Sequence, residues 1–443
     1  MNGTLVFFDG TFQSLRKQLF VSELETCAVL LATPVRLGEN SKYIVKDEIY
    51  FSEADYAERS ALSASLRSEV VFGVASRAKR QDLTLIFVHT HPSMDGFPIF
   101  SSIDDRGEGA LAPFLAQYLP NQTALSLILS KDGCSARTVP TAKPLRVIEV
   151  NRSFAFLSRI NEGGADFERT DRQIRAFGKS ILPVLENLRV GVIGLGGTGS
   201  LTTQQLAYLG VQDFVLMDDD IVELTNLNRV VGATHADINR FKTDVASDLV
   251  ARIAPNAKVQ NLQESVLEDA SARKLLDRDF LFCCTDSHGS RAVLIQLAYQ
   301  YAIPCIDMGI SITTKEGKIT HIVGRVQFLG PGLGCLTCGG LLDAGEVRID
   351  LMTEHERRRD PYFLGQAEPQ PSVISLNSTV SSLAVTMFLG VVTQAPLATR
   401  FQRYDALSGT VRSVEHLPRP GCVVCSASGA LARGDTWPLP ARR

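Results

Sequence analysis

Two histidines stand one residue apart at the end of an apolar run, within IFVHTHPSMDGFPIFSSIDD at residues 86–105. If LTLIFVHTH forms a β-strand, His89 and His91 point to the same face, because side chains alternate along a strand. Two imidazoles can then reach one metal ion, and Asp104 can supply a third ligand, which leaves the fourth position of a zinc ion for water. Glu25 could accept a proton from that water, and Ser101 could donate a hydrogen bond to an oxyanion. The pattern predicts a hydrolytic zinc site.

Two details of this site stay open in the sequence. SSIDD offers two SxxD pairs, Ser101 with Asp104 and Ser102 with Asp105, and Glu23 is a rival to Glu25 as the base. An isolated HxH pair at a strand end is more often ordinary polar surface than a metal site. The metal interpretation therefore depends on the accompanying residues.

Those companions resemble a known family. Glu25 in ETC, which we interpret as the start of a helix, followed by HTHP and SxxD, resembles the JAMM (Mov34/MPN) zinc metalloproteases, which cut isopeptide bonds after the C-terminal Gly-Gly of ubiquitin. The resemblance covers residues 1–140 or so. It implies the following roles: general base Glu25, zinc ligands His89, His91 and Asp104, and oxyanion support by Ser101.

A second group of motifs begins with VGVIGLGGTGSLTTQQLAYLG, a glycine-rich turn between a predicted strand and a predicted helix. Such a turn lets backbone N–H groups approach phosphates, but it also occurs in dinucleotide-dependent oxidoreductases. A nicotinamide site would place one acidic residue after the next strand, whereas VLMDDDIVELTNLNR has three. Asp218 or Asp220 can bind ribose hydroxyls or a metal ion. Arg229 and Lys242 can neutralise a triphosphate, and Asp286 in CCTDSHGSR can hold Mg²⁺ where pyrophosphate leaves. These residues indicate nucleoside triphosphate chemistry.

The motifs DRQIRAFG, GLGGTGS, DDDIVELTNLNR, Lys242 and CTDSHGSR, across residues 165–426, resemble the ubiquitin-activating-enzyme superfamily, which includes the thiamine- and molybdopterin-pathway adenylyltransferases. Its members adenylate the C-terminal glycine of a β-grasp ubiquitin-like protein with Mg-ATP. The resemblance implies these roles: a nucleotide loop of Gly194, Gly196, Gly197 and Gly199, ribose binding by Asp218, phosphate binding by Asn226, Arg229 and Lys242, and Mg²⁺ binding by Asp286.

Arg172 in DRQIR resembles the arginine that reaches the ATP of the neighbouring subunit in that superfamily. The resemblance therefore implies a homodimer. Without the flanking motif, Arg172 would be an ordinary charge on a surface helix.

Two CxxC pairs, in GLGCLTCGG and PGCVVC, offer four thiolates with the spacing of a closed structural zinc site. A closed site leaves no position for water, so we assign it no catalysis. Its ligands are Cys335, Cys338, Cys422 and Cys425. The other cysteines lie mostly in apolar runs and are predicted to be buried packing residues: Cys27, Cys134, Cys283, Cys284 and Cys305.

Ubiquitin-activating enzymes that form a thioester carry a cysteine in the loop after the first zinc knuckle, and residues 339–378 contain none. A thioester in this loop is therefore excluded. Either the adenylate passes directly to another protein, such as a conjugating-enzyme-like acceptor, or a hydroxyl such as Thr353 or Ser372 carries the ubiquitin-like protein as an oxyester. The run EHERRR in the loop is typical of a solvated helix face.

The elements that must position these residues need more than one domain, because 443 residues exceed what one hydrophobic core usually serves. A hydrophobic content of 45%, a charged content of 21% and a net charge of −3 are typical of a soluble globular protein and give no electrostatic basis for nucleic-acid binding. The N-terminus lacks the pattern of a signal peptide, and the longest apolar run, SSLAVTMFLGVV, is too short for a bilayer and predicts a buried helix. We therefore expect a cytoplasmic protein without membrane contact.

The predicted fold class is α/β with two domains. Short strands such as KYIVKDEIYF, LTLIFVHTH and ALSLILS, with helical stretches such as ALSASLRSEVVFGVASRAKR, indicate an α+β domain over residues 1–150. A linker over 151–165 leads to a doubly wound, Rossmann-like domain over 166–426, with strands RVGVIGLG, FVLMDDD, KVQNLQE, FLFCCTD and IPCIDMG and a zinc knuckle of four cysteines. Residues 427–443 are a C-terminal tail.

Together the two resemblances imply a bifunctional enzyme that adenylates a ubiquitin-like protein and also cuts after its C-terminus. Similar pairings occur in bacterial operons for ubiquitin-like conjugation, some linked to phage defence. Three alternatives remain. The adenylate could become a thiocarboxylate on a sulfur-carrier protein, or the chain could be a non-enzymatic scaffold for a ubiquitin-like tail. A nicotinamide-dependent dehydrogenase is the third.

Overall fold

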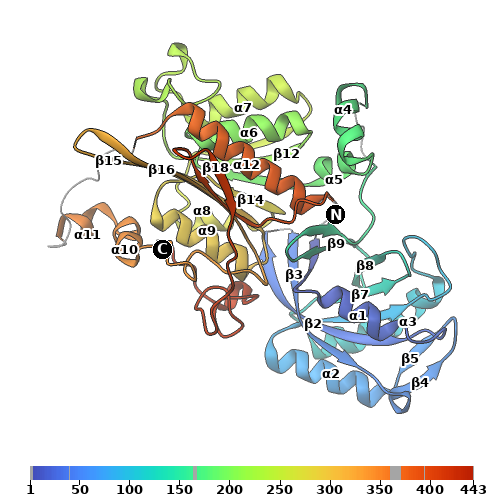
Figure 1. Cartoon of the computed structure of the whole chain (residues 1–443). Coiled ribbons are helices and arrows are strands. Elements are labelled where there is room, and N and C mark those ends of the chain that lie inside the picture. The colour runs from blue at the N-terminus through green and yellow to red at the C-terminus, as the bar shows by residue number, and fades with distance from the viewer. Residues whose placement is uncertain (1–2, 39, 163–166, 360–370, 394, 443) are drawn as a thin grey trace. The chain divides into compact units, whose positions relative to one another are not determined.

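A computed structural model describes residues 3–38, 40–162, 167–359, 371–393 and 395–442 (Figure 1). The chain forms two compact units. Unit 1 comprises Met1–Ile160 and Ala432–Trp437, and unit 2 comprises Asn161–Leu431 and Pro438–Arg443. The boundary falls inside the predicted linker. That linker differs from the structure in one respect, because Phe154–Phe156 form a strand of unit 1.

Unit 1 is built on an eight-stranded sheet with the order β1-β3-β2-β6-β7-β8-β9-β10, and a further pairing of β1 with β9 closes the order on itself. The strands are β1 (Gly3–Phe8), β2 (Cys27–Leu37), β3 (Asn40–Tyr50), β6 (Thr84–Thr90), β7 (Ala124–Leu129), β8 (Cys134–Val139), β9 (Pro144–Val150) and β10 (Phe154–Phe156). Three helices accompany them: α1 (Thr11–Leu19), α2 (Ser68–Gln81) and α3 (Ser102–Tyr118). Unit 1 is thus a mixed domain of strands and helices, and its assignment as a JAMM-type domain stays a prediction.

Both faces of this sheet are buried, which explains why its central strands are continuously apolar. Leu30 packs in a core cluster with residues of α1, whereas its neighbours Val29 and Leu31 pack in a second cluster with residues of α2 and α3. This alternation along β2 is the period of two expected of a strand. Helices on both sides therefore fix the register of β2 and β6, the two strands that lead to the histidines.

Two predictions about local structure in unit 1 are wrong. The stretch at 61–80 was predicted to be helical throughout, but its first part forms β5 (Ala64–Leu66), which pairs with β4 (Tyr56–Arg59) in a separate hairpin after a short 3₁₀ turn, η1 (Glu53–Asp55). The ETC stretch is not the start of a helix, because Cys27 begins β2. Serine, threonine and charged residues in such short segments leave no clear period for sequence analysis to detect.

Part of the predicted tail also belongs to unit 1. Thr33 Oγ1 on β2 donates a hydrogen bond to the carbonyl of Ala432 at 3.0 Å, and the 3₁₀ turn η4 (Gly434–Thr436) packs against the same strand. The residues after it, Pro438–Arg443, belong to unit 2.

Unit 2 contains a second eight-stranded sheet, with the order β13-β12-β11-β14-β15-β16-β17-β18. The pairs from β13 to β15 are parallel and those from β15 to β18 are antiparallel. Its strands are β11 (Arg189–Ile193), β12 (Asp213–Met217), β13 (Lys258–Leu262), β14 (Phe280–Cys283), β15 (Cys305–Lys315), β16 (Lys318–Leu329), β17 (Phe401–Asp405) and β18 (Thr410–Ser413). The predicted Rossmann-like arrangement is confirmed for the parallel part.

Helices cover both faces of this sheet: α6 (Gly197–Leu209), α7 (Lys242–Ile253) and α12 (Ile374–Val392) lie together on one face, and α8 (Asp269–Arg273) and α9 (His288–Gln300) lie on the other (Figure 1). The unit also contains α4 (Phe167–Phe177), α5 (Ile181–Asn187), α10 (Ala344–Leu351), α11 (Glu354–Arg359) and the 3₁₀ turns η2 (Leu224–Asn226) and η3 (His235–Asp237). Strands β11, β12 and β14 are adjacent and parallel, so their carboxyl ends share one edge, where ligands of such sheets bind.

Helix α12 is the predicted buried helix, but it is longer than predicted. Its 19 residues are long and apolar enough to span a membrane, but 56% of its most apolar stretch is buried inside the protein. A buried core helix passes the same test of length and composition. It contacts α6, β15 and β16, as a core helix does.

Candidate functional sites

The sheet of unit 1 brings Glu25 and the two histidines together. Strands β2 and β6 are antiparallel with Cys27 opposite His89, so Glu25, two residues before Cys27, lies beside the end of β6. His91 follows β6, and its N–H donates to Leu129 O on the neighbouring strand at 2.7 Å. This hydrogen bond extends the strand geometry past Thr90, which keeps both imidazoles on one side.

Asp104 reaches the same place from the first turn of α3. Ser101 caps this helix: its Oγ accepts hydrogen bonds from the N–H groups of Ile103 and Asp104, both at 3.2 Å, and its own N–H donates to Asp104 Oδ2 at 2.5 Å. Such a reciprocal capping box fixes the aspartate side chain. Asp105 instead pairs with Arg137 at 2.7 Å. The structure therefore places the Ser101 and Asp104 pair, rather than Ser102 and Asp105, at the cluster.

The three side chains converge at distances that fit one metal ion. His89 Nε2 lies 2.9 Å from Asp104 Oδ1 and 3.2 Å from His91 Nε2, and His91 Nε2 lies 3.7 Å from Asp104 Oδ2. In a tetrahedral zinc site with bonds of about 2.0–2.1 Å, ligand atoms lie about 3.3 Å apart. The donor set and its spacing therefore suit zinc.

The electrostatics of the cluster separate its carboxylates. Burial raises the pKa of Glu25 to about 7, although His89 opposes the shift. Burial also opposes ionisation of Asp104, but hydrogen bonds from His89 and Ser101 and the charge of His89 outweigh it and hold the pKa of Asp104 well below its usual range. Burial lowers the pKa of His91, which favours the neutral imidazole that a metal needs. Glu25 is thus suited to exchange protons near neutral pH, and Asp104 to act as an anion.

A hairpin that sequence analysis missed holds the peptide of Glu25. Ser60 O accepts a hydrogen bond from Glu25 N at 2.8 Å, and Arg59 Nε donates to Glu25 O at 2.9 Å. Arg59 Nη2 also donates to Thr26 Oγ1 at 2.7 Å. Glu25 is 7% exposed, and its Oε1 lies 3.8 Å from His91 Nε2, whereas the rival Glu23 is exposed. The structure places Glu25, and not Glu23, at the cluster.

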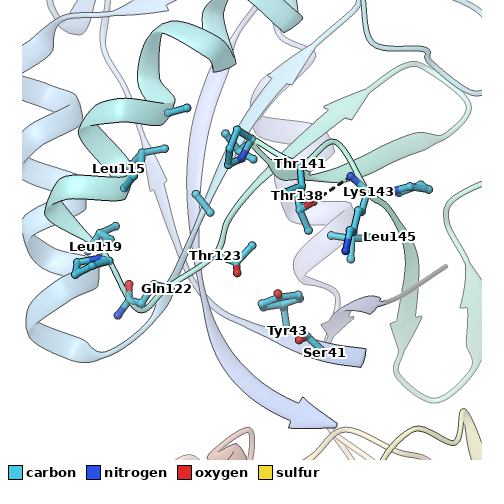
Figure 2. A pocket seen from close by; sticks show the side chains of 17 residues that line it. Ser41, Tyr43, Leu115, Leu119, Gln122, Thr123, Thr138, Thr141, Lys143 and Leu145 are labelled. Atoms are coloured by element: carbon cyan, nitrogen blue, oxygen red, sulfur yellow. Dashed lines mark hydrogen bonds between the residues drawn. The ribbon is translucent and has the colours of Figure 1, made fainter. Parts of the chain in front are cut away.

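Unit 1 also contains a cavity of about 420 Å³ away from these residues (Figure 2). The second half of α3 and the β8–β9 turn line it, and in that turn Lys143 N donates to Thr138 Oγ1 at 3.0 Å. Within the described chain, neither Glu25 nor any of the three clustered side chains lines this cavity. It is a separate feature from the cluster.

The glycine-rich turn of unit 2 joins β11 to α6. Gly194 has a φ of +86°, a conformation that favours glycine. A Cβ at Gly199 would lie 1.8 Å from Gly194 O, so only glycine allows the turn to close this tightly. Gly196 is the N-cap of α6, and Gly197 is its first residue. The turn therefore presents the N-terminus of α6, where backbone N–H groups and the helix dipole favour an anion.

Asp218 follows β12 and is buried beside this turn. Its Oδ2 accepts from Leu195 N at 2.6 Å and its Oδ1 accepts from Asp220 N at 2.8 Å, so the carboxylate braces the glycine-rich turn. Burial raises the pKa of Asp218, and Lys242 opposes the shift. The bracing role was not anticipated from the sequence. Each oxygen still has a second lone pair, so ribose binding remains compatible with it.

The predicted phosphate-binding residues lie around the same edge. Asn226 is buried and accepts a hydrogen bond from Glu223 N, which fixes the turn that carries Arg229. Arg229 donates to Thr225 O at 2.5 Å. Lys242, the first residue of α7, pairs with Asp220 at 2.6 Å.

Two residues predicted to act at the nucleotide site are exposed to solvent. Asp286 is exposed in the loop between β14 and α9. Arg172 is exposed on α4 and makes no hydrogen bond or ion pair with the described residues, while the helix is attached through Gln173 Nε2, which donates to Tyr208 O at 3.0 Å. Arg172 therefore takes no part in the nucleotide site of its own chain through any described contact.

The four predicted cysteines converge in unit 2. Cys335 Sγ lies 3.6 Å from Cys422 Sγ, and Cys338 Sγ lies 3.4 Å from Cys425 Sγ. Ligand atoms in a zinc site with bonds of about 2.3 Å lie about 3.8 Å apart, so the cluster suits zinc. A hydrogen bond from Cys425 lowers the pKa of Cys335 to about 5, and Arg419 N donates to Cys338 Sγ. All nine cysteines are free thiols, and the five outside the cluster are buried, as predicted.

The two hydroxyls considered as oxyester carriers differ in their surroundings. Thr353 Oγ1 donates to Glu356 Oε2 at 2.8 Å at the exposed start of α11. Ser372 Oγ accepts from Asn377 Nδ2 at 3.0 Å. Residues 360–370 of the same loop lie outside the described chain.

Residues 170–424 match the model of the ThiF family. The chain belongs to the ThiF family. It is 28% identical to the molybdopterin-synthase adenylyltransferase of Salmonella typhimurium over 259 residues, which cover 58% of this chain and 95% of that protein. It is 26% identical to the SAMP-activating enzyme E1 of Haloferax volcanii over 54% of this chain and 81% of that protein. The predicted ThiF-type domain is thus confirmed, and residues 1–169 lie outside the match.

Among solved structures, Escherichia coli MccB with ATP is similar to this chain with a TM-score of 0.44 at 19% identity, covering 58% of this chain and 74% of that one.

Proposed function

We propose that unit 2 is an ATP-dependent adenylyltransferase that activates the C-terminal carboxylate of a ubiquitin-like or sulfur-carrier protein. The observation that carries this proposal is the glycine-rich turn braced by Asp218 at the edge formed by β11, β12 and β14, within a ThiF-family sequence. Relatives named as adenylyltransferases and as an activating enzyme support it.

In this reaction an oxygen of the substrate carboxylate attacks the α-phosphorus of ATP, the bond from that phosphorus to the bridging oxygen breaks, and pyrophosphate leaves. The N-terminus of α6 would hold the phosphates, and Arg229 and Lys242 would neutralise charge on the leaving pyrophosphate. Lys242 would exchange its partner Asp220 for phosphate. Mg²⁺ would be held by Asp286 and would add positive charge at the phosphates.

Exchange of labelled pyrophosphate into ATP tests this proposal. The full chain with Mg-ATP and a ubiquitin-like protein that ends in glycine should catalyse exchange, and Asp286→Ala should reduce it by about 100-fold or more. Exchange that is absent with every glycine-ended ubiquitin-like or sulfur-carrier protein, in a preparation that is folded, would refute it.

We further propose that unit 1 is a zinc peptidase that cuts after the same C-terminal tail. The convergence of His89, His91 and Asp104 at ligand spacing supports this, because such a set leaves one position of the ion open. The zinc ion would act as a Lewis acid and lower the pKa of bound water. Glu25 would accept a proton from the attacking water and return it to the leaving amine, and the Ser101 hydroxyl would donate a hydrogen bond to the oxyanion.

A ubiquitin-like protein with an extension after its terminal glycine tests the peptidase. Intact-mass measurement should show removal of the extension by the wild-type chain and no removal by Glu25→Gln. A metal chelator should abolish cleavage, and zinc should restore it. Equal cleavage by the wild-type chain and Glu25→Gln would refute the assignment.

The fate of the adenylate separates three versions of the adenylation proposal. Since residues 339–378 contain no cysteine, transfer to an acceptor protein, transfer to a hydroxyl and conversion to a thiocarboxylate all remain consistent with the site. The relative named as a sulfur carrier protein ThiS adenylyltransferase favours testing the thiocarboxylate version. Added sulfide with a sulfurtransferase should then yield the thiocarboxylate mass, whereas an adduct on this chain that survives thiol but not hydroxylamine would indicate an oxyester.

The superfamily resemblance of Arg172 also leads us to propose a homodimer, in which Arg172 reaches the ATP of the second copy. Its exposed position without a described partner supports this. Mixing Arg172→Ala with Asp286→Ala chains should restore exchange through hybrid dimers, and sedimentation should give the mass of a dimer.

A further inference from the structure

Asn377 on α12 lies against the nucleotide loop although it stands 180 residues further along the chain than Gly197. A Cβ on Gly197 would lie 2.0 Å from Asn377 Nδ2 and 3.6 Å from Arg229 Cβ. Any side chain at Gly197 would therefore displace the amide. Asn377 thus occupies the space beside the first residue of α6, next to the arginine predicted to bind phosphate.

The amide of Asn377 uses only part of its hydrogen-bonding capacity. Its Nδ2 donates to Ser372 Oγ at 3.0 Å, and this is its one side-chain hydrogen bond to a described residue. An amide has two N–H donors and a carbonyl acceptor, so one donor and the carbonyl remain unused. Asn377 is 4% exposed, and a donor in such surroundings gains free energy when a ligand binds it.

The location of the unused N–H donor points to an anion. The N–H groups of the first turn of α6 and the Arg229 side chain belong to the same edge, and both favour negative charge. Nδ2 is the amide atom that lies against Gly197, and it is a donor. Ser372 is the partner that orients this amide, because its hydroxyl accepts the other N–H.

We propose that the Asn377 amide donates a hydrogen bond to the phosphates of ATP at the N-terminus of α6, with Ser372 as the residue that positions it. The proposal rests on the adenylation function proposed for unit 2 and adds a contact from α12 to it. It also explains why glycine is required at position 197, since the loop must admit the amide as well as the nucleotide.

ATP binding to the full chain in the presence of Mg²⁺, measured by calorimetry without a protein substrate, tests the proposal. Asn377→Ala should raise the Kd for ATP by about tenfold or more, as expected for a lost hydrogen bond to a charged group. Asn377→Asp, which keeps the shape but adds negative charge, should raise the Kd further. Ser372→Ala should raise it by about threefold, because the amide remains but is less well oriented.

Ser382→Ala is the matched control for packing of the two helices. Ser382 lies on α12 and accepts a hydrogen bond from Gln205 Nε2 of α6 at 3.2 Å, so its loss perturbs the same helix pair away from the loop. Its Kd should equal that of the wild type. Thermal unfolding identifies any variant that does not fold, and Asn377→Asp serves if Asn377→Ala is unstable.

The outcomes separate this inference from the proposed function. If the wild type binds ATP and exchanges pyrophosphate while Asn377→Asp has the same Kd, the Asn377 contact is wrong and adenylation stands. If the folded wild type does not bind ATP, the adenylation proposal fails and the Asn377 contact fails with it.

Discussion

The clustered side chains of unit 1 and the proposed nucleotide site of unit 2 are positioned in different ways. In unit 1 the proposed chemistry depends on side chains that the fold already holds together: His89, His91 and Asp104 are half-buried or buried, and their possible ligand atoms lie within 4.8 Å of one another. In unit 2 the fixed part is backbone, since Asp218 braces the glycine-rich turn, while Lys242 pairs with Asp220 and Asp286 is exposed.

This difference fits what each proposed ligand would require. A zinc ion requires several donor atoms at defined distances, so the side chains need to be positioned before it binds. A triphosphate is larger and is held by backbone N–H groups, and flexible cations can move to meet it. Unit 1 should therefore lose its metal ion with any one ligand side chain. In unit 2 the glycine-rich turn should keep its shape without Lys242 or Asp286 and should depend on the buried brace Asp218.

Removal of a metal ligand in unit 1 should have the largest effect on activity and metal content. His89→Ala should abolish the proposed peptidase activity and remove about one of the two zinc ions that we propose per chain, because the remaining two donors cannot complete the site. Plasma mass spectrometry of the purified protein measures the zinc. Asp105→Asn, beside the proposed ligand Asp104 but paired with Arg137, is the control and should retain both ions. Unchanged zinc in His89→Ala would exclude this site.

Loss of a cysteine ligand should affect unit 2 by destabilising it. If the four cysteines bind zinc, Cys338→Ser should lose that ion and lower the stability of unit 2 by more than about 2 kcal/mol, since an ion there would tie residues 335–338 to 422–425. Calorimetric unfolding and zinc content measure both effects. Cys284→Ala removes a buried cysteine outside the cluster and should retain the ion. Two bound ions in Cys338→Ser would contradict the four-thiolate assignment.

A variant of Arg59 tests whether the backbone position of Glu25 affects catalysis in unit 1. Arg59→Ala removes the donor to Glu25 O, so kcat for peptide cleavage should fall by about tenfold with zinc retained. Hydrogen exchange of residues 21–27 should also increase. Arg67→Ala is the matched control, because Arg67 Nε donates to Tyr56 O in the same hairpin and not to the Glu25 segment. Equal exchange in both variants would show that Arg59 does not hold this peptide.

The smallest expected effect is a pH-dependent gain of stability in Glu25→Gln without metal. The folded-state pKa of Glu25 is raised from 4.5 to about 7, so the folded state favours the protonated acid and loses stability as pH rises between these values. Glutamine stays neutral. With a chelator present, Glu25→Gln should therefore unfold at a higher temperature than the wild type at pH 8.5 and at a similar one at pH 5. An equal difference at both values would argue against the raised pKa.

Sequence analysis predicted the residues of both proposed sites where their geometry is set by local patterns. An HxH at a strand end, an SxxD that caps a helix and a glycine-rich turn are each set by residues close in the chain, so their geometry follows from strand and helix rules. The two SxxD pairs could be distinguished only in the structure. There Asp105 pairs with Arg137 of β8 and not with the two histidines.

Contacts that depend on long-range packing were not predictable. Arg59 reaches Glu25 through a hairpin whose strands are too short to show a period, and Asn377 reaches Gly197 only because α12 packs on α6. The sequence predicts that Asp218 is a ribose ligand. That Asp218 also braces the turn is visible only in the structure, where its carboxylate accepts a hydrogen bond from Leu195 N. The assignment of Ala432–Trp437 to unit 1 likewise had no local signal.

The most direct test of the central claim, that one chain carries an adenylation site and a separate peptidase site for the same tail, uses a ubiquitin-like protein with an extension after its terminal glycine. Wild-type chain and His89→Ala are each incubated with this protein and Mg-ATP, and substrate mass and pyrophosphate release are followed together. The account predicts that the wild type removes the extension and then releases pyrophosphate, whereas His89→Ala releases pyrophosphate only from protein that was already trimmed. Removal of the extension by His89→Ala, or equal pyrophosphate release from trimmed and untrimmed protein, would contradict it.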